Sequence, residues 1–304
     1  MLKWGRRIIL FILVNFLVMF TISLLINLLG VRPYLTARGI DYTSLMVICL
    51  LWGFGGAIIS LMLSGFMAKW MMGIKMIDPD KPGGAEERWL LDTVDRLAKA
   101  AGLENTPEVG VYQSPDPNAF ATGATRYNSI VAVSAGLFQH LDKDEIEGVL
   151  GHEMTHVANG DMVTMTLLQG VINAFVMFLS RVIAIFLTQR GRDDRPNYFA
   201  EYMLTQMLQM VFGILGMIPI MAFSRWREFR ADAGGAKLAG KTKMINALKA
   251  LEAALQMPPV AEPAAVAAFK ISSRDGFSLF ASHPPLEERI ARLQALDVSS
   301  VVSE

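Results

Sequence analysis

The sequence has little charge. Only 18% of its 304 residues are Asp, Glu, Lys or Arg, compared with about 25% in an ordinary soluble domain. Hydrophobic residues make up 53%, so the composition indicates a membrane protein. Acidic and basic residues balance at 28 each, which gives no bulk electrostatic attraction to nucleic acid. We therefore expect a lipid bilayer, and no nucleic acid, among the partners of this chain.

Cysteine and histidine are also scarce. The single cysteine, Cys49, excludes an intrachain disulfide, and its apolar neighbours favour a packed thiol over a nucleophile. The chain has four histidines. Two of them, His152 and His156, fall within one stretch of six residues, and this coincidence makes an accidental pattern there less plausible.

Residues 151–156 read GHEMTH, an HExxH motif. Helical residues four apart lie on one face, so His152 and His156 can both offer imidazole nitrogens to one zinc ion. Glu153 stands beside the first histidine, where it can accept a proton from water activated by the metal. The motif alone is only moderately specific, because chance matches occur in the solvated helices of many proteins.

Two uncharged apolar runs precede the motif. Residues 8–31 exceed the roughly 20 residues needed to cross a hydrocarbon core, and they are longer than the apolar part of a cleaved signal peptide. Residues 42–68 form the second run. Basic residues ahead of the first run predict a cytoplasmic N-terminus, and two crossings then return the chain to the cytoplasm.

Two more apolar runs follow the motif, within residues 162–224. An arginine-rich connector, residues 189–201, joins them and would lie outside if both runs span, against the positive-inside tendency. Arg181 interrupts the first run and is costly in lipid unless it snorkels or is buried in protein. The segment is therefore either a spanning hairpin, which we favour, or a hairpin that packs on protein or dips into the bilayer. Both arrangements begin and end on one side.

Between the two hydrophobic pairs the sequence predicts a soluble region with a small sheet. Helical spacing of apolar residues predicts a helix over residues 86–101. Apolar and β-branched segments predict three strands, over residues 108–113, 118–123 and 129–133. Asp142 and Glu145 resemble a capping box, which predicts that the motif helix runs from about residue 143 to residue 158. Charged residues in its first turns argue against placing this helix in lipid.

Two amphipathic helices are predicted in the C-terminal part, over residues 241–255 and 285–296. The segment between them begins with a Pro- and Ala-rich stretch, residues 256–265, which reads as a loop or linker.

A catalytic zinc ion usually has three protein ligands and an open position for water. Asp161 is only five residues after His156 and would have to reverse direction, which argues against it as a ligand. Glu201 stands at the far end of the arginine-rich connector. Glu228 and Asp232 are four residues apart on one helical face, so Glu228 can ligate zinc while Asp232 accepts a hydrogen bond from the spare ring nitrogen of a ligand histidine. The alternative is a solvated helix with ion pairs to its neighbouring arginines.

Three segments together resemble the HtpX-type membrane zinc metalloproteases, relatives of the eukaryotic CAAX prenyl endoproteases: GHEMTHVANGD, SRWREFRADAGGAKLAG and SHPP at residues 282–285. The resemblance covers nearly the whole chain. It implies zinc ligation by His152, His156 and Glu228, catalysis by Glu153, and a conserved aspartate at Asp232. It also implies proteolysis of misfolded or damaged membrane proteins at the cytoplasmic face, in bacterial envelope quality control. Other membrane quality-control proteases are then candidate partners.

The resemblance gives two further expectations. In related gluzincins the segment at Asn118, Ala119 and Phe120 is the edge strand that pairs with an extended substrate, a mode of binding that needs no particular sequence. The alternative is an ordinary core strand. Gluzincins also commonly bring a late histidine to the developing oxyanion, which suggests this role for His283. Alternatively, His283 merely begins the last helix.

We therefore predict an α+β, mainly helical fold: a polytopic protein of the inner or cytoplasmic membrane with a cytoplasmic gluzincin-like zinc metallopeptidase domain, formed by a small sheet and the HExxH helix. The predicted parts are a transmembrane hairpin, residues 1–69; the two parts of the metallopeptidase domain, residues 70–161 and 225–304; and the second hydrophobic hairpin, residues 162–224. One Zn²⁺ per chain is the expected cofactor, and unfolded polypeptides or membrane proteins are the expected substrates. Two alternatives stay open: a more selective prenyl-protein endoprotease, and a non-catalytic membrane scaffold or holdase with a vestigial site.

Overall fold

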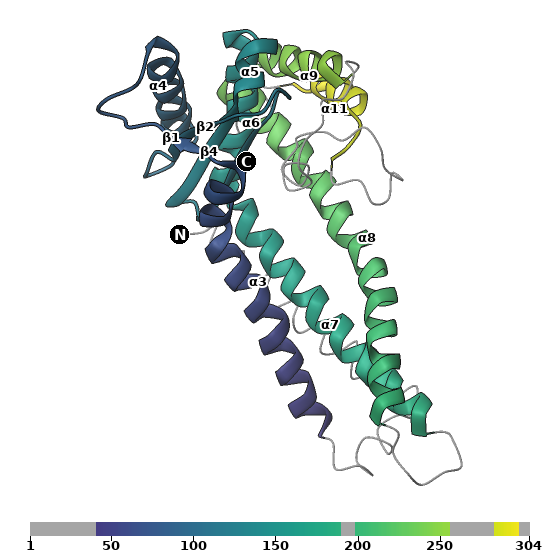
Figure 1. Ribbon diagram of the computed structural model, residues 1–304. Coiled ribbons are helices and arrows are strands. Elements are labelled where there is room, and N and C mark those ends of the chain that lie inside the picture. Colours follow the sequence, from purple (N-terminus) through teal and green to yellow (C-terminus); the bar gives the residue numbers. More distant parts are fainter. Residues whose placement is uncertain (1–40, 190–197, 256–282, 298–304) are drawn as a thin grey trace. The chain divides into compact units, whose positions relative to one another are not determined.

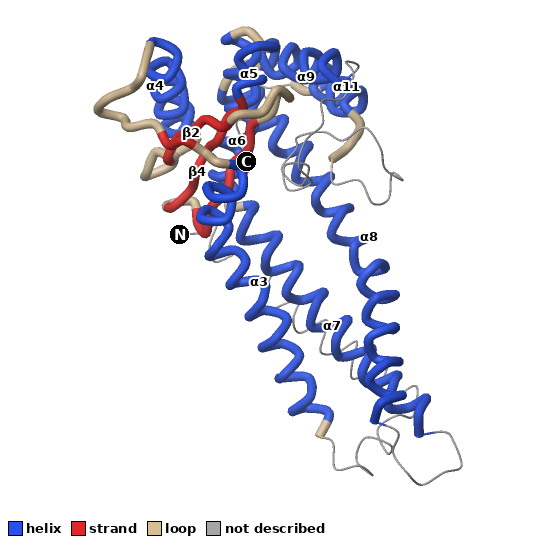
Figure 2. The backbone as a smooth tube through the Cα atoms, viewed as in Figure 1, coloured by secondary structure: helices blue, strands red, loops and turns tan. Residues whose placement is uncertain are grey.

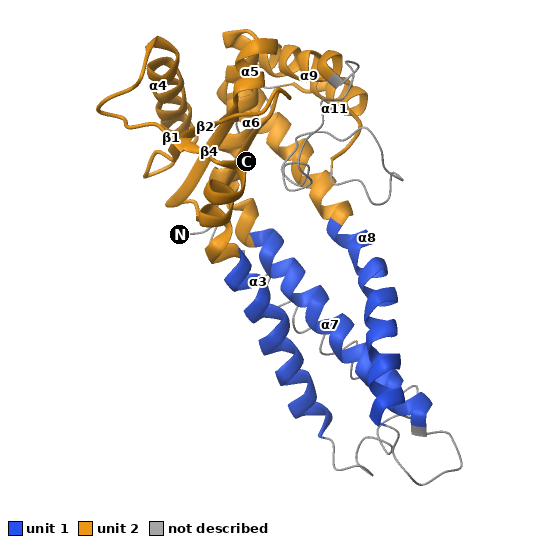
Figure 3. Cartoon of the chain, in the orientation of Figure 1, with its two compact units in different colours: residues 1–60, 164–220 blue, residues 61–163, 221–304 orange. Residues whose placement is uncertain are grey.

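The computed structural model describes residues 41–189, 198–255 and 283–297 (Figure 1). The first predicted apolar run, residues 8–31, and the predicted linker, residues 256–265, lie outside the described residues. The chain divides into two compact units (Figure 3). One comprises Met1–Ser60 and Thr164–Ile220, and the other comprises Leu61–Val163 and Met221–Glu304. Each unit is therefore assembled from segments that are distant in the sequence.

Within the described residues, three helices are long and apolar enough to cross a membrane. They are α3 (Tyr42–Met72), α7 (Asp161–Gln189) and α8 (Tyr198–Leu238). In the first unit, α3 and α7 approach closely at two glycines: a Cβ atom on Gly53 would lie 2.7 Å from the main-chain nitrogen of Ala174, and one on Gly170 would lie 2.6 Å from the ring of Phe54. Small residues at such contacts let apolar helices pack backbone to backbone.

The two apolar runs after the motif are helical. The first continues through Arg181, whose side chain is exposed, as one helix α7. The second is the N-terminal part of α8, which contains Pro219 and exposes a long apolar surface. The exposed large side chains of this part are Tyr198, Phe199, Tyr202, Met203, Met207, Met210, Val211, Ile214, Leu215 and Met217. An apolar surface of this extent is typical of contact with lipid or with another protein.

Cys49 is buried among apolar side chains, as predicted for a packed thiol.

The second unit contains a four-stranded sheet with the order β1-β2-β4-β3, drawn in red in Figure 2. Its strands are β1 (Lys75–Met76), β2 (Glu108–Tyr112), β3 (Ala119–Thr125) and β4 (Asn128–Ser134). β2 and β4 are parallel, whereas the other two pairs are antiparallel. The three predicted strands are confirmed to within two residues at each end. The short strand β1 is an addition that the sequence pattern does not predict.

Both faces of this sheet are covered. One face packs on α4 (Ala85–Ala100) and on the motif helix α6 (Lys143–Asn159), and forms the main core. The other packs on the C-terminal end of α3 through Ala68 and Met72. Because successive strand residues point to opposite faces, the main core receives Val109, Ala119, Val131 and Val133, and the opposite cluster receives Tyr112, Phe120 and Ala132.

The motif helix α6 has defined ends. The predicted capping box is confirmed: Asp142 accepts a hydrogen bond from the main chain of Glu145 at 2.8 Å, and Glu145 accepts one from the main chain of Asp142 at 2.9 Å. The helix ends at Gly160, whose left-handed conformation (φ 60°, ψ 42°) suits a residue without a side chain. The chain turns there, and α7 begins at Asp161.

Two predicted C-terminal helices are confirmed as α9 (Lys241–Leu255) and α11 (Leu286–Ala295), and a short helix α5 (Ala135–His140) precedes the motif helix. α9 packs tightly on α6, because a Cβ atom on Gly148 would lie 2.6 Å from the main-chain oxygen of Lys243. α11 packs on α9 in an apolar cluster that includes Met244, Leu248, Leu286, Ile290 and Leu293. The second unit therefore surrounds α6 with the sheet, α4 and α9.

Candidate metal centre

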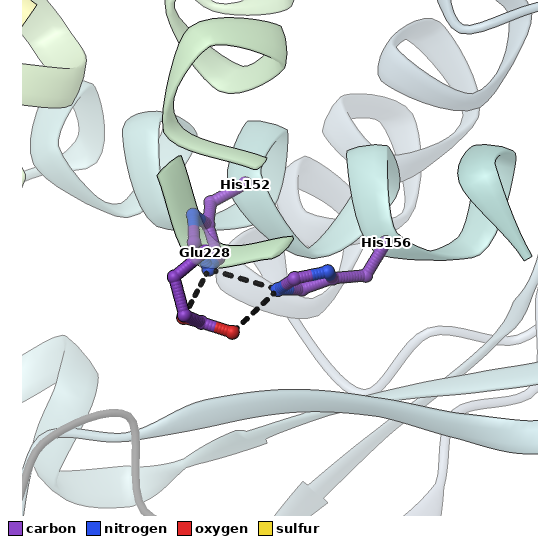
Figure 4. A group of neighbouring side chains, drawn as sticks. All are labelled: His152, His156 and Glu228. Carbon is purple, nitrogen blue, oxygen red and sulfur yellow. Dashed lines mark hydrogen bonds and ion pairs between the residues drawn. The ribbon is translucent and has the colours of Figure 1, made fainter. Parts of the chain in front are cut away.

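Three side chains from two helices converge in the second unit (Figure 4). His152 and His156 lie one turn apart on α6, and Glu228 lies on α8. Their ligand atoms are all within 4.8 Å of one another. The two Nε2 atoms are 3.1 Å apart, and each is 3.4 Å from one oxygen of the Glu228 carboxylate. The structure therefore brings together the three residues that the sequence assigns as ligands.

The spacing of these donors fits a tetrahedral zinc site. With bond lengths of about 2.0–2.1 Å, neighbouring donors around a tetrahedral ion are roughly 3.3–3.4 Å apart. The observed separations of 3.1 Å and 3.4 Å agree with this value. All three residues are buried, and three protein ligands leave the fourth position for water, as in catalytic zinc sites.

The Nδ1 atom of each histidine lies at hydrogen-bond distance from a carboxylate. His152 Nδ1 lies 2.9 Å from Asp232 Oδ1, and His156 Nδ1 lies 2.7 Å from Asp161 Oδ2. Because an ionised carboxylate only accepts hydrogen bonds, each Nδ1 donates. Both Nε2 atoms then face Glu228 and each other, an arrangement that requires a cation between them, either a proton or a metal ion.

Asp232 makes the contact with a ligand histidine that the sequence predicts. Asp161 makes the equivalent contact with His156. This contact is not predicted, because the sequence pattern is interpreted for Asp161 only in terms of metal ligation. The left-handed turn at Gly160 supplies the reversal that seemed to exclude Asp161. The Asn-Gly-Asp sequence at residues 159–161, where the motif helix ends, is the signal that could have indicated this turn.

Glycines bring α8 close enough to α6 to place Glu228 and Asp232 at the histidines. A side chain on Gly234 would overlap that of Thr155. A Cβ atom on Gly235 would lie 2.9 Å from the main-chain nitrogen of His152, and one on Gly151 would lie 3.0 Å from the Cβ atom of Ala239. The Gly-Gly pair in the downstream motif therefore has a steric reason.

Glu153 is buried and turns toward the sheet. Its Oε2 atom accepts a hydrogen bond from the main-chain N–H of Ala121 on β3 at 2.8 Å. No described strand pairs with the outer edge of β3, because β4 lies on its other side. The N–H of Ala121 points away from β4, so strand alternation turns the main-chain groups of Ala119 and Ala121 to this outer edge.

The segment predicted as a substrate strand has buried side chains, and some of its main-chain groups face the outer edge of β3. The side chains of Asn118, Ala119 and Phe120 are all buried. Asn118 donates from Nδ2 to the hydroxyl of Tyr112 at 2.8 Å, and its main-chain N–H donates to the hydroxyl of Ser134 at 2.9 Å. The main-chain groups that face the outer edge of β3 therefore belong to Ala119 and Ala121, while the side chains of Asn118 and Phe120 are buried.

His283 lies at the site, just before α11. Its Nδ1 atom is 2.8 Å from Glu228 Oε2. The structure therefore places this late histidine beside the carboxylate that completes the ligand set.

Two arginines also reach the site. Arg289 on α11 is fully buried and donates to both oxygens of Asp232, and Arg227 donates to Glu228 Oε1 at 3.0 Å. A solvated face for the arginines near Glu228 is only the alternative interpretation of the sequence pattern, and Arg289 is not among the residues that the pattern singles out. An arginine three residues from Leu286 and four from Leu293, on the buried face of a predicted helix, is the signal that could have found it.

The surrounding carboxylates also change the basicity of the histidines. Burial lowers the pKa of His152, but hydrogen bonds with Asp232 and Glu228 outweigh burial and raise this pKa to about 9 in the metal-free protein. For His156, burial is likewise outweighed by hydrogen bonds with Asp161 and Glu228, so its pKa is also raised. At neutral pH the metal-free site therefore holds a proton that a metal ion must displace.

The first prediction concerns pH. Since His152 is protonated below about pH 9 in the metal-free protein, the apparent affinity for Zn²⁺ should fall as the pH is lowered from 8 to 6. The fall should be about tenfold per pH unit for each proton displaced. Competition with a chelator, measured at several pH values, gives this slope. An affinity that does not change across this range would contradict the raised pKa.

The second prediction concerns Asp161. Replacing it by Asn removes the anion that orients His156, so the affinity for Zn²⁺ should fall by about 10- to 100-fold. Asp95→Asn is the control, because Asp95 is half-buried on α4 and pairs with Lys99. Equal affinities for the Asp161→Asn variant and the unsubstituted protein would show that this carboxylate does not support the site.

Comparison with known proteins adds to the geometry. A family model described as peptidase family M48 matches residues 84–297. The Protease HtpX homolog of Bacillus subtilis (strain 168) is 47% identical over 297 residues, which cover 96% of this chain and 99% of that protein. Protease HtpX of Stenotrophomonas maltophilia (strain K279a) is 49% identical over 296 residues, with the same two coverages.

A solved structure shares the fold. The crystal structure of S. mikatae Ste24p superposes with a TM-score of 0.58 at 20% identity, covering 94% of this chain and 67% of that one. The mainly helical α+β fold and the resemblance to HtpX-type proteases are therefore confirmed, and the family implies a metal cofactor. The chain is a membrane metalloprotease, and it belongs to peptidase family M48.

Proposed function

We propose that the chain is a zinc endopeptidase whose metal is held by His152, His156 and Glu228. The observation that carries this proposal is the convergence of the three donors while both Nδ1 atoms donate to carboxylates. A zinc ion bound there would supply Lewis-acid polarisation of the scissile carbonyl and a lowered pKa for water. One ion per chain fits this single set of donors among the described residues.

In this proposal Glu153 is the general base. It neighbours His152 in the motif, and the hydrogen bond from Ala121 orients its carboxylate. It takes a proton from the attacking water and later gives this proton to the leaving amine. The same hydrogen bond joins the base to the strand that would hold the substrate. The position of Glu153 relative to a substrate on this strand would therefore be fixed.

We propose that an extended substrate adds to the outer edge of β3. This edge offers the main-chain groups of Ala119 and the carbonyl of Ala121, whose N–H donates to Glu153, and main-chain pairing does not select a sequence. Asn118 and Phe120 support the strand from within, through Tyr112 and the apolar cluster. A site of this kind suits unfolded polypeptides and the loosened segments of damaged membrane proteins.

We assign to His283 the stabilisation of the oxyanion. Its 2.8 Å contact with Glu228 places the ring beside the ligand set, and an imidazole N–H can donate to the oxygen on which charge develops. For that step the ring must exchange its bond to Glu228 for one to the substrate.

The proposed setting is the inner membrane, with several crossings and with the active site on the cytoplasmic side. Three helices of membrane length support the crossings. Lys69, Lys75 and Lys81, which follow or end α3, support a cytoplasmic position for the second unit. We also propose a role in protein quality control, which the resemblance to HtpX-type proteases implies, with other membrane proteases as candidate partners. The relatives named Protease HtpX support the proteolytic activity itself.

The third prediction tests the base. Glu153→Gln should lose cleavage of an unfolded model protein by about 10²- to 10⁴-fold, because the proton acceptor is removed. It should still bind one zinc ion per chain, because the three ligands remain. Glu287→Gln is the control, since Glu287 is exposed on α11. Equal cleavage by Glu153→Gln and the unsubstituted protein would contradict the proposed peptidase mechanism.

The same assay separates the alternatives. A prenyl-protein endoprotease would cleave a prenylated peptide and leave the unfolded protein intact, and a holdase would bind the unfolded protein without cleaving it. The proposal predicts cleavage of the unfolded protein whether or not a prenylated peptide is present.

The fourth prediction tests the orientation. A reporter inserted within residues 189–201 should be accessible from the side opposite the cytoplasm, because the two flanking apolar runs are proposed to span the bilayer. A reporter fused after residue 304 should be accessible from the cytoplasm. Detection of both reporters on the same side would rule out a spanning hairpin.

A further inference from the structure

Arg289 contacts the candidate metal centre through Asp232 rather than through the atoms that would bind the metal. It belongs to α11 and is 1% exposed. Its Nε atom donates to Asp232 Oδ2 at 2.8 Å, and its Nη2 atom donates to Asp232 Oδ1 at 2.6 Å. Two parallel hydrogen bonds from one guanidinium fix both the position and the plane of the carboxylate.

The same carboxylate holds His152. Asp232 Oδ1 accepts from His152 Nδ1 at 2.9 Å as well as from Arg289 Nη2. Nη2 lies 3.4 Å from His152 Nδ1, and both atoms donate to the shared oxygen rather than to each other. Arg289 therefore reaches the metal position through Asp232 and His152, across 137 residues of sequence.

The charge of Arg289 has a chemical consequence for this relay. A guanidinium stays charged at every accessible pH, and hydrogen bonds between ionised partners are shorter and stronger than neutral ones. A carboxylate fixed in position and plane by Arg289 presents Oδ1 to His152 Nδ1. This contact fixes the tautomer and the ring orientation of His152 and turns its Nε2 atom toward the metal position.

Anchoring of α11 does not by itself account for this arginine. The helix already packs on α9 through Leu286, Ile290 and Leu293. Among the described residues, Arg289 Nη1 is buried without a hydrogen-bond partner. An apolar side chain of similar volume would avoid this cost, and buried ion pairs are often replaceable by such side chains without loss of stability.

We propose that Arg289 is a positioning residue of the metal centre: it fixes the Asp232 carboxylate by two hydrogen bonds, so that Asp232 holds His152 in the ligating orientation. The proposal rests on the metal centre put forward as the site of the proposed function. It makes α11 part of that site, because the helix supplies the clamp from a segment outside both zinc motifs.

The test measures Zn²⁺ affinity and the rate of zinc loss for the full chain in detergent, by competition with a chelator. Arg289→Gln keeps length and polarity but removes the charge and the fork, and it should weaken the affinity by about 10- to 100-fold. Arg289→Lys keeps the charge without the fork and should lie between. Arg292→Gln is the matched control: Arg292 is exposed on the same helix and pairs with Glu288, and its affinity should stay within about twofold of the unsubstituted protein.

A second arm separates positioning from support of the fold. If Arg289 acts through Asp232, then Arg289→Gln should cause little further loss of zinc affinity in an Asp232→Asn background. Additive losses, or a lowered thermal unfolding temperature with unchanged zinc affinity, would overturn the proposal. If Arg289→Gln does not fold, Arg289→Lys decides by the same criterion, with a loss of about fivefold expected. Absence of zinc binding in the unsubstituted protein would instead refute the proposed function.

Discussion

The metal centre depends on buried carboxylates that hold two imidazole rings by their Nδ1 atoms. Asp161 and Asp232 accept hydrogen bonds from the Nδ1 atoms, while the carboxylate of Glu228 faces the Nε2 atoms. With Glu153, four buried carboxylates lie at the site, against the guanidiniums of Arg227 and Arg289. An unpaired buried ion costs several kcal/mol, so this excess of negative charge favours a divalent cation. The electrostatics and the donor spacing therefore lead to the same conclusion.

The fold gathers these charges from separate stretches of sequence. The motif helix supplies both histidines and Glu153, the turn at Gly160 returns Asp161 to the second histidine, and α8 brings Glu228 and Asp232 across a contact made close by glycines. β3 meets the site through the hydrogen bond from Ala121 to Glu153. The candidate site is thus built where helices and a sheet edge meet.

Much of this arrangement is predictable from local patterns. Three patterns span only one or two turns of helix and can be recognised in the sequence alone. They are the capping box at Asp142, the HExxH spacing, and the four-residue spacing of Glu228 and Asp232. The contact of Asp232 with His152 follows from the same geometry.

Other features depend on distant segments and stay hidden. The contact of Asp161 with His156 requires the left-handed turn at Gly160. The contact of Arg289 with Asp232 joins residues 57 positions apart, so it forms only when α11 packs beside α8. Which main-chain groups of β3 face outward is decided by its pairing with β4, and no residue type records that choice. β1 is only two residues long and offers no period to detect.

X-ray absorption at the zinc edge of the purified, zinc-loaded chain identifies the atoms that bind the metal. We expect a first shell of about four nitrogen and oxygen donors at roughly 2.0–2.1 Å, with the outer-shell pattern of two imidazole rings. One donor should be lost in Glu228→Ala. A shell that contains sulfur, or one with no imidazole signature, would contradict the assignment of His152, His156 and Glu228 as the ligands.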